Sequence, residues 1–102
     1  MIMGKVIGTV VSTQKDPGLS GYKLLIVQNV DLEIKLKPSY IVAVDAVGAG
    51  IGEIVIVVQG SSARITKQTE GKPVDAAIVA IVDSVDLNGK MVFQKFPSAV
   101  MV

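Results

Sequence analysis

Short apolar runs, repeatedly broken by Gly, Asp, Lys or Pro, follow one another along the whole chain. Val and Ile dominate these runs, and β-branched side chains pack well on a pleated strand but lose freedom in a helix. The pattern therefore predicts an all-β fold. We expect strands at residues 5–11, 22–28, 40–45 and 53–59, followed by a strand pair at residues 74–87 and 90–96.

Asn88-Gly89 carries the sharpest turn signal in the chain. A type I′ turn needs positive φ at both central residues, which Asn and Gly supply. Asp75 could also cap a helix, but the hairpin signal favours a strand that ends near Leu87. The other connections are expected to be a turn at residues 13–18, a loop or weak hairpin at 29–39 that Pro38 helps to close, a glycine-rich link at 46–52, one short helical turn capped by Ser61-Ser62, a mobile polar loop at 66–73, and an apolar tail at 99–102 that is either disordered or docked.

Several expected strands are apolar on both faces, notably residues 24–27, 40–44 and 54–58. In large α/β proteins helices cover such strands, but no helix of sufficient length is expected here. Large exposed apolar patches on a soluble monomer are uncommon and usually mark interfaces. We therefore predict an obligate oligomer. The alternative is that loops and the C-terminal tail cover these faces.

The chain length of 102 residues fits one domain, residues 1–102, with a single core. No apolar run approaches the roughly 20 residues that a membrane helix needs. The N-terminal segment lacks the pattern of a secretory signal, so we expect a cytoplasmic protein that does not enter a membrane. There is no Cys and no His, which removes thiol and imidazole catalysis and the common zinc sites. We predict no enzymatic activity, no cofactor and no metal.

Ten Lys plus Arg against nine Asp plus Glu leave a net charge of +1, too little for binding driven by phosphate neutralisation. The four aromatic side chains, Tyr22, Tyr40, Phe93 and Phe96, are expected to pack in the core or at interfaces rather than stack on bases. We therefore expect no nucleic-acid partner. The alternative function is an OB-like binding module for single-stranded nucleic acid or an oligosaccharide, which would depend on Tyr22 or Tyr40.

The glycines at residues 48–52 lack the context of a phosphate-binding loop, because Glu53 and a β-branched strand follow them. A tight backbone packing loop is the better interpretation. Arg64 is the only arginine, and its planar fork suits either a subunit-interface ion pair or an ordinary surface position. Solvated strand ends and turn caps account for the carboxylates Asp45, Glu53, Asp75, Asp83 and Asp86.

A succession of motifs spread over the chain adds a more specific indication. In order they are GKVIGTVV at residues 4–11, TQK at 13–15, Leu19 with GYKLL at 21–25, VDAVGAGIGE at 44–53, GSSAR at 60–64 and VDAAIVAIVD at 74–83. This succession resembles the bacterial microcompartment vertex family. The family comprises the pentameric shell proteins of carboxysomes and of ethanolamine-utilisation and related organelles.

The resemblance implies a small five-stranded, OB-like β-barrel with one short helical turn, assembled as a cyclic homopentamer that would cover the second apolar faces. It implies a non-catalytic protein in a cytoplasmic microcompartment shell, capping the five-fold vertices between hexameric shell proteins. By resemblance, two groups of residues are expected at the subunit interface or around the five-fold axis. They are the loop of Gly48, Ala49, Gly50, Ile51, Gly52 and Glu53, and the pair Ser61 and Arg64.

Overall fold

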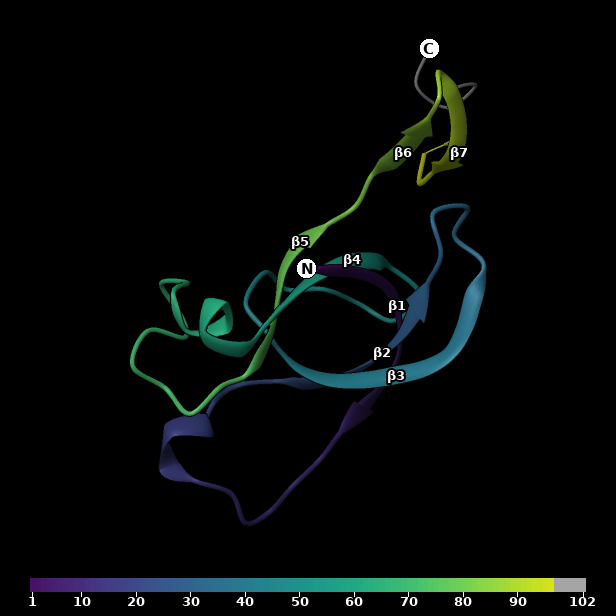
Figure 1. Ribbon diagram of the computed structural model, residues 1–102. Coiled ribbons are helices and arrows are strands. Elements are labelled where there is room, and N and C mark those ends of the chain that lie inside the picture. The colour runs from purple at the N-terminus through teal and green to yellow at the C-terminus, as the bar shows by residue number, and fades with distance from the viewer. Residues whose placement is uncertain (97–102) are drawn as a thin grey trace.

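The computed structural model describes residues 1–96, and the predicted apolar tail at 99–102 lies outside the described residues. Five strands close into a barrel in the order β1-β2-β3-β5-β4 (Figure 1). All neighbouring pairs are antiparallel except β3 and β5, which run parallel. The predicted five-stranded barrel is confirmed. The strands are β1 (Ile2–Val10), β2 (Leu24–Val30), β3 (Leu36–Asp45), β4 (Ile54–Gln59) and β5 (Ala76–Ile81).

Alternation of side chains along the strands builds the barrel interior. Val6, Val27, Val55 and Ile78 are fully buried and belong to one core cluster. Gly4 lies where β1 meets β2, and a Cβ there would overlap Val27 Cγ1 and stand 2.8 Å from the Gln28 carbonyl oxygen. Only glycine allows this approach, because the second contact is with backbone.

A second apolar cluster forms outside the barrel and consists partly of connecting segments. Val44 and Ala77 from the strands pack against Ala63 and Val74, with Leu19 at the edge. Two 3-10 turns contribute to it, η1 (Pro17–Leu19) and η2 (Gly60–Arg64). At the end of the barrel where Leu24 and Val44 lie, connecting loops therefore cover the outward apolar side chains. This agrees in part with the alternative prediction, in which loops rather than a second subunit cover these faces.

The segment after η2 is a polar loop folded into consecutive turns, and its predicted mobility stays a prediction. Thr69 is completely buried. Its hydroxyl lies 2.5 Å from that of Thr66, which also accepts the Thr69 N–H at 3.0 Å. The predicted helical turn is present as η2, but the predicted serine cap is wrong. Gly60, at φ +65°, begins the turn, so both serines fall inside it and no side chain caps it.

The segment at residues 29–39 is a true hairpin and not a loop. A turn over residues 31–35 joins β2 to β3, and the Asp31 carboxylate fixes it by accepting the N–H groups of Glu33 (2.8 Å) and Lys35 (3.0 Å). These bonds lower the pKa of Asp31, with the Lys35 N–H as the largest cause. Pro38 lies inside β3, contrary to expectation. Proline is tolerated there because β5 pairs only with Val44 and Asp45, so this part of β3 is an open edge.

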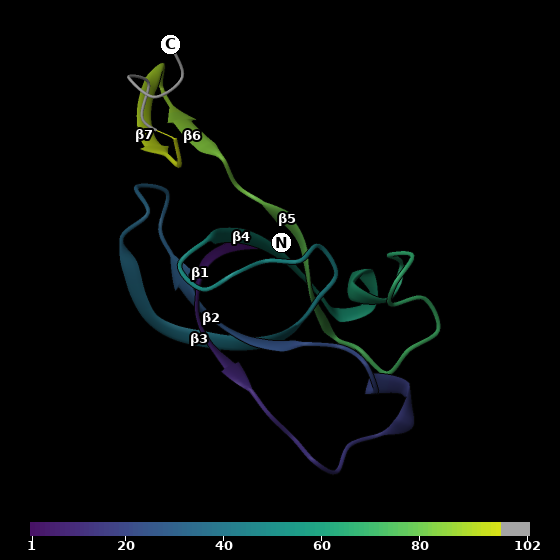
Figure 2. The ribbon, with the colours of Figure 1, turned by 180° about the vertical axis from the view of Figure 1, so that it is seen from behind.

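The strand predicted at residues 74–87 is broken in two. After β5, the Val82 N–H donates to the Ile54 carbonyl oxygen at 2.8 Å, and the chain then leaves the barrel as β6 (Ser84–Leu87). This strand pairs with β7 (Lys90–Gln94). The turn between them has φ +56° at Asn88 and +77° at Gly89, which confirms the predicted type I′ hairpin. Both ribbon views show the hairpin projecting beyond the barrel (Figures 1 and 2).

Candidate functional site

The glycine-rich loop between β3 and β4 is held by backbone hydrogen bonds. Asp45 begins it, and its carboxylate accepts the N–H groups of Val47 and Gly48, both at 3.0 Å. Gly52 ends it by donating to the Val6 carbonyl oxygen at 2.7 Å. Gly48 and Gly52 adopt φ values of +76° and +90°, which L-residues with a side chain rarely adopt. Hydrogen bonds and positive φ therefore define the loop, but the close backbone packing predicted for its glycines is not seen within one chain, because an added Cβ at Gly48, Gly50 or Gly52 would meet no atom closer than 3.5 Å.

The side chains of Ala49 and Ile51, in the middle of this loop, point into the barrel and out to solvent respectively. Ala49 is buried in the barrel core, so its side chain supports the loop from within its own chain. Ile51 is 63% exposed. A Cβ added at Gly50 would meet only the Glu53 Oε1 atom, at 3.5 Å. The loop thus presents Gly50 and Ile51 outward, with open space beside the glycine.

Glu53 connects this loop to the C-terminal hairpin. Its Oε1 atom accepts the Gly50 N–H at 2.6 Å, and its Oε2 atom forms an ion pair with the Lys95 ammonium. The Lys95 backbone N–H also donates to the Asp83 carbonyl oxygen at 2.8 Å, at the base of the hairpin. The hydrogen bond from Lys95, followed by that from Gly50, lowers the pKa of Glu53. No local pattern indicated Lys95, because it lies far from Glu53 along the chain.

Ser61 and Arg64 lie on η2, and both are exposed. Arg64 Nη1 donates to the Val74 carbonyl oxygen at 3.1 Å. Strand β4 separates the two predicted groups, because the loop of residues 48–53 precedes it and η2 follows it. The six residues of β4 span roughly 20 Å at about 3.3 Å per residue, so the groups lie at opposite ends of the strand. Within one chain, the predicted residues do not form a single site.

An apolar row crosses the outside of the barrel on β1, β2 and β3. Gly8 pairs with Ile26, and Ile26 pairs with Val42, so these residues share one face of the sheet. Val42 is 49% exposed, and Tyr40, two residues earlier on the same strand, is 61% exposed. Ile7, at the irregularity beside Gly8, is also exposed. We refer to Ile7, Gly8, Ile26, Tyr40 and Val42 as the outer face.

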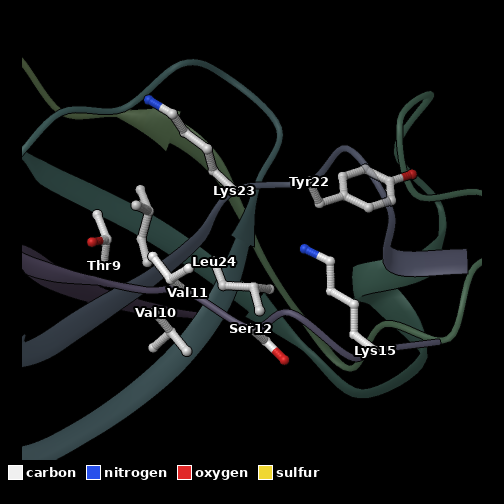
Figure 3. A pocket seen from close by; sticks show the side chains of 9 residues that line it. Thr9, Val10, Val11, Ser12, Lys15, Tyr22, Lys23 and Leu24 are labelled. Carbon is white, nitrogen blue, oxygen red and sulfur yellow. The ribbon is translucent and has the colours of Figure 1, made fainter. Parts of the chain in front are cut away.

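A hollow of about 340 Å³ lies where β1 and β2 diverge. Thr9, Ser12, Lys15, Tyr22 and Lys23 supply its polar groups (Figure 3). The Lys15 side chain extends toward Tyr22, whereas Lys23 extends away from both (Figure 3). The Ser12 hydroxyl donates to the Gln14 carbonyl oxygen. The two ammonium groups do not converge on one point, so the hollow is not built to hold an anion.

The two tyrosines that a nucleic-acid or oligosaccharide module would need are far apart. Tyr22 precedes β2 and packs on the second apolar cluster. In the β2–β3 strand pair, Leu24 pairs with Val44 near Tyr22, whereas Tyr40 pairs with Gln28 towards the opposite end. The separation is roughly 20 Å at 3.3 Å per residue. They form no continuous stacking platform of the kind that single-stranded nucleic acids use.

Residues 1–96 contain no group of three acidic, His or Cys side chains that could hold a metal ion. In the same part of the chain, no helix is long and apolar enough to cross a membrane.

Known proteins identify the fold and its role. The family described as ethanolamine utilisation protein EutN/carboxysome matches residues 1–83. The carboxysome shell vertex protein CcmL of a Nostoc species is 50% identical over 96 residues, or 93% of this chain and 95% of that protein. The shell vertex protein GrpN of Rhodospirillum rubrum is 54% identical over 86 residues, or 84% of this chain and 97% of that protein.

Two solved structures agree with these matches. The Nostoc CcmL structure has a TM-score of 0.89 at 50% identity and covers 93% of this chain and all of that one. The GrpN structure, described as a pentameric microcompartment shell protein, has a TM-score of 0.76 at 53% identity and covers 85% of this chain and 98% of that one.

These relatives confirm the predicted structural, non-enzymatic role and the location in a microcompartment shell in the bacterial cytoplasm. They do not favour the alternative of a nucleic-acid or oligosaccharide module. The chain therefore belongs to the EutN/CcmL family of bacterial microcompartment shell vertex proteins.

Proposed function

We propose that five copies of this chain form a closed ring that occupies the five-fold corners of a microcompartment shell and joins hexameric tiles there. The observation that carries the proposal is the similarity to GrpN, a pentameric shell protein, along nearly all of that chain. A layer of hexagonal tiles is flat, and it closes into an icosahedral shell only where five-fold units replace six-fold ones. A ring of five vertex proteins provides such a unit.

The ring requires a head-to-tail contact, in which one surface of each copy meets a different surface of the next. The loop of residues 48–53 and the pair Ser61 and Arg64 stand at opposite ends of β4, which suits such a contact. We infer that Gly48, Gly50, Ile51, Gly52 and Glu53 lie close to the five-fold axis, with Ala49 supporting the loop from inside. Ser61 and Arg64 lie on the subunit contact.

Native mass spectrometry tests the ring directly. One chain weighs 10.7 kDa. A closed ring of five identical chains therefore has about five times that mass. A species of five chains at micromolar concentration supports the proposal, and a single chain that persists at high concentration contradicts it.

Co-assembly tests the vertex role. Shells assembled from hexameric tiles with this protein should have closed corners and retain cargo, and shells without it should leak. Normal closure and retention without the protein would refute the role. We also infer that no nucleic acid takes part, because the net charge is only +1. A salt-sensitive complex with a single-stranded oligonucleotide would contradict this inference.

A further inference from the structure

The tip of the β6–β7 hairpin brings an exposed asparagine and an exposed glycine together. Asn88 and Gly89 have φ values of +56° and +77°, and both residues are exposed. A Cβ added at Gly89 would meet no atom of residues 1–96 within 4 Å apart from its chain neighbours. Asparagine loses its side-chain amide most readily before glycine, because no Cβ shields the glycine nitrogen. The turn residues therefore also form a chemically reactive pair.

The reaction that this pair can undergo is spontaneous deamidation. The Gly89 backbone nitrogen loses its proton to solvent and forms a bond with Asn88 Cγ, while the Cγ–Nδ2 bond breaks and ammonia leaves. The product is a cyclic imide. Water then opens the imide at either of its carbonyl carbons, which gives aspartate or isoaspartate. Overall, one water molecule is consumed and one ammonia is released, and no catalyst or oxidant is needed.

The type I′ turn opposes this reaction. Both φ and ψ are positive at the first central residue of such a turn, whereas closure of the imide needs a negative ψ at the asparagine. The imide therefore closes only while the turn is open. β6 and β7 form a sheet of their own beside the closed barrel, and a lone two-stranded hairpin is marginally stable in water. Units of this kind open locally while the rest of the protein stays folded.

Asn29 is the other asparagine of the chain, and its surroundings are the opposite. It lies inside β2, where it pairs with Gly4 of β1. Its Nδ2 atom donates to the Ser39 hydroxyl at 2.9 Å. The next residue is the β-branched Val30, which is 7% exposed. Imide formation at Asn29 would have to break the barrel itself, so this asparagine is protected.

We propose that Asn88 is a site of spontaneous deamidation, and that the pairing of β6 with β7 sets its rate. The inference does not assume the ring, because the reaction needs only Asn88, Gly89 and water. Aspartate can occupy the same turn position, and it lowers the net charge from +1 to zero. Isoaspartate also adds a carbon atom to the backbone, so the turn is lost and the pairing of Leu87 with Lys90 breaks. The hairpin tip thus carries a one-way chemical switch.

Peptide mapping by mass spectrometry, after the full chain is aged at mildly alkaline pH, tests the site. The peptide that contains Asn88 should gain the mass of an amide-to-acid conversion and separate into aspartate and isoaspartate forms. The peptide that contains Asn29 should stay unchanged. In the urea-unfolded chain, where the turn no longer acts, Gly89→Ala should slow the conversion of Asn88. Equal conversion of both asparagines, or no conversion of Asn88 in either state, would overturn the proposal.

The same assay tests whether strand pairing sets the rate. Asn88 should convert more slowly in the native chain than in the urea-unfolded chain. Phe93→Ala removes the partner of Val85 and should speed the conversion in the folded chain about fivefold, because the hairpin opens more often. Ile65→Ala, at a position that is 80% exposed and outside the hairpin, is the matched control and should leave the rate unchanged. Equal rates in native and unfolded chains, or in the two variants, would contradict the role of pairing.

Amide hydrogen exchange tests what the modification does to the hairpin. Asn88→Asp carries the new charge without the added backbone carbon, so exchange in β6 and β7 should match that of the unmodified protein. The isoaspartate form, separated from the aged protein by chromatography, should exchange faster in both strands while β1 to β5 stay protected. Identical exchange in the isoaspartate form and in Asn88→Asp would refute the opening of the hairpin.

Discussion

Gly50→Val separates the stability of the barrel from the formation of the ring. In the isolated chain an added Cβ has room, because its nearest neighbour is Glu53 Oε1 at 3.5 Å, and the position is exposed. Gly50 is not among the glycines with positive φ, so valine needs no strained backbone there. We expect the free energy of unfolding of the barrel to change by no more than about 0.5 kcal/mol.

The ring responds differently if the loop lies at the five-fold axis. Overpacking a close contact costs about 1–3 kcal/mol, and five copies repeat it, so the whole ring loses about 5–15 kcal/mol (5 × 1–3). Because about 1.4 kcal/mol is a factor of ten in an equilibrium constant, rings should be absent at micromolar concentration.

Native mass spectrometry and thermal unfolding, both on the full chain, measure the two effects of Gly50→Val separately. The expected result is a folded single chain of 10.7 kDa in place of a ring of five. An intact ring of normal thermal stability would refute the close-packed role of this loop. An unfolded chain would refute the geometric argument that Gly50 has room for a side chain.

Three further predictions concern single positions. Gly4→Ala should destabilise the barrel by about 1–3 kcal/mol in urea unfolding, because the new Cβ would overlap Val27 and the Gln28 backbone. Gly8→Ala is the control and should destabilise the barrel less, because the nearest atom to its Cβ is Ile26 Cδ1 at 3.4 Å. Asn88→Ala should speed amide hydrogen exchange in β6 and β7, because alanine at φ +56° costs roughly 1 kcal/mol, whereas Asn88→Gly should not; equal exchange in both variants would contradict this. The pKa of Glu53 lies below its ordinary value of 4.5. The ionised Glu53 carboxylate therefore stabilises the fold above that pH, and this stabilisation is lost as the pH falls through the folded pKa. Glu53→Gln should remove this contribution to the acid dependence of the unfolding midpoint, and an unchanged pH profile in the variant would contradict the prediction.

Local signals predicted much of the fold. The type I′ turn at Asn88 and Gly89 follows from two adjacent residues, and the glycine-rich loop follows from a short run of neighbours. Both depend on backbone conformations that neighbouring residues specify. The predictions failed where distant parts of the chain decide the outcome. Pro38 is tolerated in β3 only because β5 pairs further along that strand, which no local pattern indicates.

In the candidate site, too, the sequence predicted what neighbouring residues specify and missed what distant residues contribute. The sequence indicated the loop at residues 48–53, but not Lys95, which fixes Glu53 and joins the loop to the hairpin. The sequence also indicated that some strands are apolar on both faces, but not which parts remain uncovered. Leu24 packs on the second cluster, whereas Ile26, two residues later on the same face, lies on the outer face beside Gly8 and Val42.

The difference between Leu24 and Ile26 arises from the strand register and from where the connecting segments fold back. Leu19, Ala63 and Val74 come from three separate connections, and together they cover only the Leu24 end of the sheet. Among residues 1–96, no segment covers the remaining apolar surface at Ile7, Tyr40 and Val42, although burying it would be favourable by about 25 cal/mol per Å². A second copy of the chain can supply this cover. We therefore expect the ring to depend on the apolar surfaces that are left exposed within one barrel.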